Sequence, residues 1–448
     1  GTGLIRGVFY FDDATYAVRN EHVYVSSGTG WTQVTDNVAY SSSGVTLTDI
    51  TGLVRFEKFD YDGTPTMILV DSVNKPFRLN GGVFEELTGL PTDIEEASHA
   101  RSFKDHLFVA SGKNVLFSAP FSEDDFSAAS GGGSINVGSA VTGLITFREL
   151  LIIFTETSIF QLAGNTIADF QLNPITRDLG CVESDTIQEF GGDVMFLAPD
   201  GLRLLSATER NNDFGLAVVS KPIQNKLVDL LTISNSFSSV VIRAKSQYRL
   251  LGFNSNYTND AGKGIIGVQK ALQGGIGTEW SETLGINARV AYSDYIESLE
   301  IVLFANGDGY VYNMESGNNF DGENIPATFR TPFFTINDPN VRKQLHKIQL
   351  FTDPKGTIEG DVTVKYDFDD PDYVQPESIS ISNTATDVAL YGRAVYGTDK
   401  FGGTLRKLFN INAVGSGEVI SLQFTSNTNN PPFSLDAVSL QYLQSGRR

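Results

Sequence analysis

The sequence predicts an all-β protein, a seven-bladed β-propeller followed by a β-sandwich-like domain. Its composition favours strands and turns, with 31 Phe, 16 Tyr and 44 Gly against only 3 Met and 2 Trp. Apolar hairpin patterns recur about every 45 residues, which lies in the range of propeller blades. Amphipathic helical periodicity is almost absent, and the best helix candidate is the short segment 221–231.

Seven hairpin units occupy the first part of the chain. Each has a short apolar strand, a polar or glycine turn, and a strand with an aromatic or long aliphatic residue. The units lie at residues 10–27, 55–71, 101–120, 148–164, 191–206, 246–271 and 298–315, with turns such as Asp62-Gly63, Ser111-Gly112, Asp200-Gly201 and Asn306-Gly307. A single blade cannot bury both faces, so neighbours around a ring supply the core. Six blades result if one unit lies outside the ring.

Two separate β-sandwiches would also give alternating strands, but the regular spacing without a linker favours the propeller. A polar joint at 315–327 ends the hairpin period, and longer strand patterns follow at 328–336, 344–352, 361–368, 418–426 and 433–443. We therefore expect a propeller over residues 1–325 and a β-sandwich-like domain over 326–448.

Charge and cysteine content exclude several classes of function. The chain has 33 basic and 53 acidic residues, a net charge of −20; residues 1–325 hold 21 and 40 of them, and the remainder 12 and 13. A surface this acidic disfavours binding to nucleic acid or to an anionic membrane. The single cysteine, Cys181, rules out internal disulfides. The apolar run at 150–154 is too short to cross a membrane, so no direct membrane insertion is expected.

The residues that carry chemistry are scattered. The four histidines, His22, His99, His106 and His346, show no metal-ligand spacing. Cys181 has no base beside it in the sequence and is expected to be a small core residue. No phosphate-binding glycine loop and no nucleophile elbow is present.

Two acidic clusters and one aromatic turn are further candidate sites. The segment 367–373 places Asp367, Asp369, Asp370 and Asp372 close together but lacks the glycine and the terminal glutamate of an EF-hand loop. It is expected to be an exposed turn, as is the segment 122–126. Residues 30–34, Gly-Trp-Thr-Gln-Val, match only part of a sialidase aspartate-box turn. The sequence therefore predicts no catalytic, cofactor-binding or metal-binding residue, and no enzyme.

The order of segments resembles the tail hub, or nozzle, protein of short-tailed bacteriophages. The resemblance rests on residues 1–25, 146–164, 169–207, 218–227 and 331–353, which follow one another as in that family. There the first propeller strands follow an N-terminal arm. No signal peptide is visible, and the chain begins at Gly1 close to strand-like sequence, so we expect that a segment before it is missing.

The resemblance implies a structural virion protein that is assembled in the bacterial cytoplasm and forms a homohexameric ring below the head-to-tail adaptor. Tail fibres or spikes and a distal plug or needle would be its partners, and DNA would pass through without specific binding. Acidic residues of the propeller would then line the ring channel, and the nearly neutral C-terminal domain would make much of the subunit contact. Two alternatives are a carbohydrate-binding or glycoside-hydrolysing β-propeller and a monomeric scaffold propeller that binds proteins on one face.

Overall fold

The computed structural model describes residues 3–27, 30–34, 51–61, 63–92, 94, 96–206, 218–258, 261–272, 275–372, 374–383 and 408–447. The chain forms two compact units, Gly1–Glu315 and Ser316–Arg448. The division lies before the boundary expected at residue 325, because Ile325 already pairs with Thr428 in a sheet of the second unit.

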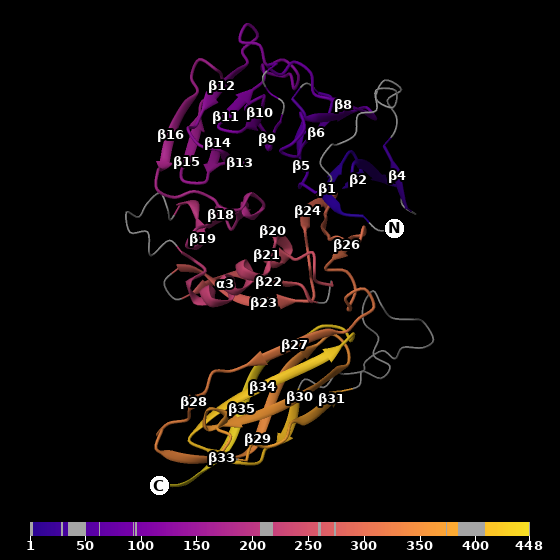
Figure 1. Ribbon diagram of the computed structural model, residues 1–448. Helices are drawn as coiled ribbons and strands as arrows, with labels where there is room; N and C mark the ends of the chain where they lie inside the picture. The colour runs from indigo at the N-terminus through magenta and orange to yellow at the C-terminus, as the bar shows by residue number, and fades with distance from the viewer. Residues whose placement is uncertain are drawn as a thin grey trace. The chain divides into compact units, whose positions relative to one another are not determined.

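The first unit is a seven-bladed β-propeller, as predicted (Figure 1). Blade 1 contains β1 (Ile5–Phe11), β2 (Ala14–Arg19), β3 (His22–Ser26) and β4 (Trp31–Gln33). Blade 2 contains β5 (Arg55–Phe59), β6 (Thr66–Val70), β7 (Phe77–Asn80) and β8 (Val83–Glu86). Blade 3 contains β9 (His99–Phe103), β10 (His106–Ser111), β11 (Asn114–Phe117) and β12 (Gly133–Asn136). Blade 4 contains β13 (Val141–Phe147), β14 (Leu150–Thr155), β15 (Ile159–Ala163) and β16 (Gln171–Thr176).

The remaining three blades complete the ring. Blade 5 contains β17 (Gln188–Phe190), β18 (Asp193–Ala198) and β19 (Gly201–Leu204). Blade 6 contains β20 (Ser236–Ile242), β21 (Gln247–Phe253), β22 (Lys263–Leu272) and β23 (Gly275–Leu284). Blade 7 contains β24 (Val290–Ile296), β25 (Leu299–Ala305) and β26 (Val311–Met314). Each of the seven predicted hairpin units falls in a different blade; of the turn at Asp62-Gly63, Asp62 lies outside the described residues.

Apolar side chains fill the spaces between neighbouring blades. Between blades 3 and 4, for example, Phe108 and Phe117 pack against Leu151 and Ile153, and all four are buried. Each strand alternates its side chains between its two faces, so one strand contributes to the core on both sides of its blade. This is why the strand patterns are apolar on both faces.

Blades 7 and 1 close the ring by packing. Ile5 and Val8 of β1 form a buried cluster with Ala305 of β25, and the Ile5 N–H donates a hydrogen bond to the Asn306 carbonyl at 3.3 Å. Among the described strands, no ladder joins the first blade to the last. The contact between these blades is therefore made by apolar packing, aromatic ring contacts and a backbone hydrogen bond instead of a shared strand ladder.

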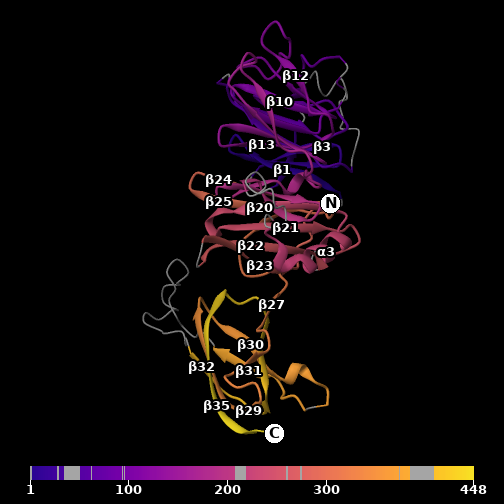
Figure 2. The same ribbon diagram turned by 90° about the vertical axis from the view of Figure 1, so that its left-hand side faces the viewer.

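The α-helix α3 (Gln224–Ile233) confirms the helix expected at 221–231, and the 3₁₀ helix η3 (Lys221–Ile223) leads into it. It lies against β21 and β22 of blade 6 (Figure 2). Leu227 and Leu230 on its inner side join the cluster that contains Leu250 and Ile265. No described helix is long and apolar enough to span a membrane.

The second unit is a β-sandwich of two antiparallel sheets. One sheet contains β27 (Ile325–Arg330), β28 (Phe334–Thr335), β30 (Ile358–Tyr366), β31 (Ile379–Asn383) and β34 (Val419–Thr428). The other contains β29 (Val341–Pro354), β32 (Leu408–Asn412), β33 (Ser416–Gly417) and β35 (Phe433–Arg447). Ile348 of β29 and Val362 of β30 are members of the buried cluster between the sheets. The strand expected at 328–336 is interrupted, because β27 ends at Arg330 and β28 begins at Phe334.

Candidate functional site

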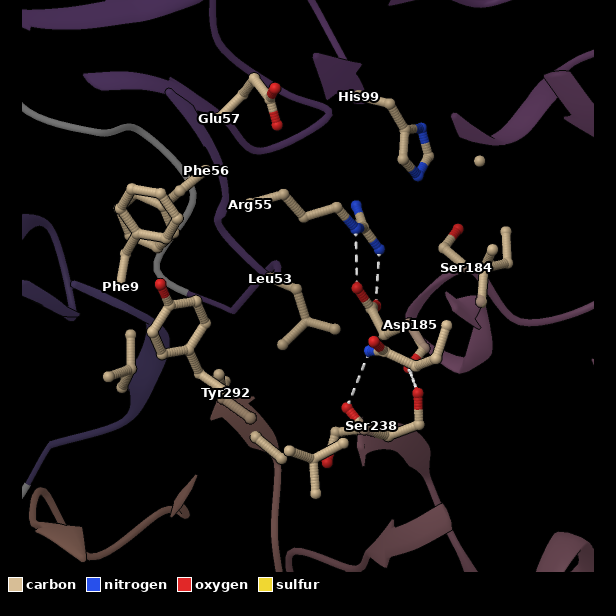
Figure 3. Close-up of a pocket in the computed structure, with 18 of the residues that line it drawn as sticks. Phe9, Leu53, Arg55, Phe56, Glu57, His99, Ser184, Asp185, Ser238 and Tyr292 are labelled. Carbon is tan, nitrogen blue, oxygen red and sulfur yellow. Dashed lines mark hydrogen bonds and ion pairs between the residues drawn. The ribbon is translucent and has the colours of Figure 1, made fainter. Parts of the chain in front are cut away.

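A cavity of about 400 Å³ lies at the centre of the propeller. The first strands of blades 1 to 4, 6 and 7 line it, and blade 5 contributes both β17 and the 3₁₀ helix η1 (Ser184–Thr186) before it. These segments come from seven places between Arg6 and Ser293, so only the closed ring brings them together (Figure 3). This cavity gathers polar and charged side chains from all seven blades and is therefore the candidate site.

An ion pair crosses this cavity from blade 2 to blade 5. The Arg55 guanidinium donates from Nε and Nη2 to the two oxygens of Asp185, at 2.9 and 2.8 Å, and from Nη1 to the Ser98 carbonyl at 3.3 Å (Figure 3). Burial lowers the pKa of Arg55, but the charge and hydrogen bonds of Asp185 more than offset this and raise it. Arg55 thus keeps its charge, and the pair links two blades that are not neighbours in the ring.

The segment that carries Asp185 is also held from blade 6. Ser239 Oγ donates to the Asp185 carbonyl at 2.7 Å, and Gln188 Nε2 donates to the Ser239 carbonyl at 3.1 Å. Asp185 is therefore fixed by backbone contacts as well as by its carboxylate. The two-point Arg55–carboxylate geometry adds direction to the charge attraction.

Glu57 of β5 is a second carboxylate of the cavity, with its side chain 12% exposed. Its Oε1 accepts a hydrogen bond from the Ser102 N–H at 2.9 Å, and its Oε2 lies 3.2 Å from Arg101 Nη1. Burial raises the pKa of Glu57, and the charge of Arg101 and the bond from Ser102 only partly oppose this. Both oxygens have partners, so Glu57 is placed as a structural group of the wall.

His99, the first residue of β9, presents a ring nitrogen to the cavity. Its Nδ1 lies 3.0 Å from Ser98 Oγ, and that hydroxyl donates to the Ala110 carbonyl at 3.4 Å. With the hydroxyl proton directed there, we assign the imidazole hydrogen to Nδ1, which makes Nε2 an acceptor. Nε2 is buried and has no hydrogen-bond partner among the described residues. Burial and the charge of Arg55 hold the pKa of His99 well below its usual value, so the ring is neutral.

The opposite wall is aromatic. Phe9 and Phe56 stack with ring centroids 5.3 Å apart and planes 5° from parallel, and Tyr292 lies at a tilt 5.3 Å from Phe9. All three are half-buried. Figure 3 shows them across the cavity from His99 and Asp185. Tyr292 donates to Asp294 at 2.6 Å; burial and that bond raise its pKa, so the phenol stays protonated.

The cavity wall has more basic than acidic residues, whereas the first unit as a whole has more acidic residues. Residues 1–315 hold 21 basic and 38 acidic residues. The lining instead contains five arginines and three acids, namely Arg6, Arg55, Arg101, Arg243, Arg289, Glu57, Asp185 and Glu189. The acidity of the propeller therefore lies mainly outside this cavity.

Only one of the four histidines considered from sequence reaches the cavity, His99. His22 is half-exposed beside Glu21, and His346 is exposed on β29. His106 is buried among aromatic rings between blades 3 and 4, with Nδ1 2.5 Å from the Ser118 carbonyl. No group of three potential metal ligands occurs in the described part of the chain.

Cys181 is a buried core residue, as predicted. It is 0% exposed in the cluster between blades 4 and 5, and burial raises the pKa of its thiol to about 12. A protonated, inaccessible thiol is a poor nucleophile.

The acidic clusters serve local structure. Asp367 accepts from the Glu418 and Val419 N–H groups at 2.7 and 3.2 Å, and Lys365 pairs with Asp369. Tyr373, at the end of that segment, lies outside the described residues.

In the other acidic cluster, Glu123 is only 5% exposed, so the expectation of an exposed turn is wrong there. The reason is an ion pair between blades: Arg78 Nη1 of blade 2 lies 2.9 Å from Glu123 Oε1, and this pairing offsets the cost of burying the carboxylate. In residues 30–34, Trp31–Gln33 form the outer strand β4, which is exposed. Neither segment lines the central cavity.

Comparisons with known proteins give only distant likenesses. No family model matches the sequence, and no curated protein matches it. An ancestral GH74 enzyme is 10% identical, with a TM-score of 0.46 over 70% of this chain and 48% of that one. The surface component PorZ of the Porphyromonas gingivalis type-IX secretion system is 10% identical, with a TM-score of 0.41 over 76% and 43%. The AfRom2 CNH domain is 8% identical, with a TM-score of 0.41 over 70% and 96%. This chain thus spans less than half of the first two proteins.

Proposed function

We propose that this chain is a structural virion protein that forms the ring-shaped tail hub, or nozzle, of a short-tailed bacteriophage. The observation that carries the proposal is the order of its parts. The segments that resemble the tail hub family fall in a propeller and then in a separate two-sheet unit, in the sequence that the resemblance implies. Six copies would form a ring below the head-to-tail adaptor, assembled in the host cytoplasm.

The path for DNA in such a ring would run between copies of the chain. The propeller cavity has a volume of about 400 Å³ and is crossed by the Arg55–Asp185 pair, which suits a small molecule and excludes a duplex. With 38 acidic against 21 basic residues, the propeller surface would repel phosphates. A channel wall of that sign would let DNA slide without specific binding.

A scaffold role also fits the hydrogen bonding of two carboxylates in the cavity. Asp185 gives both oxygens to Arg55, and Glu57 gives its oxygens to Arg101 and Ser102. Glycoside hydrolysis needs two carboxyl groups free to exchange protons or attack across a sugar. The alternative of a glycoside-hydrolysing propeller is therefore the weaker proposal. Attachment of fibres or spikes and of a distal plug would use outer surfaces.

Light scattering on the purified full chain tests the proposal. A ring has a mass several times the 48.7 kDa of one chain, and six copies are expected. Removal of residues 328–448 should abolish the ring, because that nearly neutral region is proposed to make much of the subunit contact. A monomer that hydrolyses a polysaccharide, and loses this activity in Glu57→Gln, would replace the hub by the enzyme.

A further inference from the structure

The central cavity contains a feature that a scaffold does not need. His99 is 8% exposed, and its Nε2 is a buried acceptor without a protein partner. The Arg55 guanidinium, whose charge acts on His99, directs its hydrogens to Asp185 and to the Ser98 carbonyl. An acceptor buried in this way is unfavourable unless a donor reaches it. A donor group on a molecule bound in the cavity would satisfy it.

We propose that the propeller cavity binds a small neutral polyol of monosaccharide size, with one hydroxyl donating to His99 Nε2 and an apolar ring face against Phe56 and Tyr292. The site lies wholly in the first unit. The proposal is therefore independent of ring formation and of the tail hub function.

The charges of the cavity argue for a neutral ligand. Four of its five arginines pair with carboxylates, in Arg6–Asp71 at 3.2 Å, Arg55–Asp185 at 2.8 Å, Arg101–Glu57 at 3.2 Å and Arg243–Glu300 at 3.9 Å. An anion would have to compete with these carboxylates. A metal ion would meet a single imidazole beside the Arg55 charge.

The two walls match the two sides of a sugar or related polyol. Such a molecule has hydroxyl groups around its edge and C–H groups on its faces. The half-buried rings of Phe56 and Tyr292 offer an apolar surface, while Nε2 of His99 lies opposite as an acceptor (Figure 3). The volume of about 400 Å³ is at the small end of ordinary ligand pockets.

Ligand-observed NMR with D-glucose, D-galactose and D-mannose tests the proposal, with D-glucuronate as the charged counterpart. At least one neutral sugar should receive saturation from the protein, and more strongly than glucuronate. His99→Phe should weaken its binding about three- to tenfold, the loss of one hydrogen bond. His99→Gln, which keeps an acceptor, should restore part of it.

His106→Phe is the matched control, because its Nε2 is also buried without a partner but lies outside the cavity. It should leave sugar binding unchanged. If His99→Phe does not fold, Phe56→Leu tests the aromatic wall at similar volume and should also weaken binding.

Three results would overturn the proposal: no saturation of any neutral sugar, stronger binding of glucuronate than of its neutral parent, or equal binding by wild type and His99→Phe.

Discussion

Loss of the Arg55–Asp185 pair should destabilise the propeller far more than loss of an ordinary surface pair. The side chains are 23% and 29% exposed, and two short hydrogen bonds join them. Two unit charges about 4 Å apart attract by about 4 kcal/mol at an effective dielectric constant of 20, before the cost of desolvation. Breaking a fully buried pair costs about 3–5 kcal/mol and an exposed one under about 1 kcal/mol. Because the Arg55–Asp185 pair is only partly exposed, we expect a coupling free energy of about 2 kcal/mol between the two side chains.

The assay is a double-mutant cycle with Arg55→Met and Asp185→Leu, measured by urea unfolding. Both tryptophans, Trp31 and Trp280, lie in the propeller, so their fluorescence reports the unfolding of this unit. Trp280 is the better probe. Its indole N–H donates to the Val219 carbonyl at 2.9 Å, and unfolding breaks this hydrogen bond and so changes the surroundings of the indole ring.

The pair Lys270–Glu279 is the control within the same unit. Its side chains are 61% and 54% exposed, and its coupling should stay below about 1 kcal/mol. If the Arg55–Asp185 cycle gives no more coupling than this control, the pair does not tie blade 2 to blade 5 as described.

Three further predictions concern single groups of the propeller. Because the pKa of His99 is lowered in the fold, its contribution to stability is complete above the usual value of 6.5 and is lost as pH falls below it, by up to about 1.4 kcal/mol per pH unit. In His99→Phe, the free energy of unfolding measured with urea should therefore depend less on pH between about pH 7 and 5, and an unchanged slope against pH would contradict this. Cys181 should react with a maleimide only as fast as the propeller unfolds, because burial raises its pKa to about 12; rapid labelling of native protein would show an accessible thiolate. The raised pKa of Glu57 means that its charged form is disfavoured in the fold, so stability is lost as pH rises through that pKa. Glu57→Gln should therefore leave stability at pH 7 within about 1 kcal/mol of wild type or above it, and a loss above about 2 kcal/mol would contradict this.

Local patterns were enough to predict the blades. The turn at Ser111-Gly112, for example, joins β10 to β11, and Gly112 has φ of 54°, a conformation that glycine adopts without strain. Such turns and their flanking apolar strands are encoded within about 20 residues. The count of seven followed from them directly.

The cavity could not be predicted in the same way. Arg55 and Asp185 lie 130 positions apart, and nothing near either residue indicates the other. His99 looked isolated in sequence, since its neighbours across the cavity come from other blades. The burial of Glu123 is not predictable for a related reason, because its ion-pair partner Arg78 belongs to another blade. Contacts between blades depend on how the ring closes, and the sequence of a single blade does not indicate which residues of other blades it will meet.

The most direct test of the proposed tail hub is electron microscopy of the purified full chain, alone and with a head-to-tail adaptor. Six-fold rings with an axial opening, formed by the chain itself or on the adaptor, are the expected result. Single propellers that neither assemble nor attach to the adaptor would contradict the proposal.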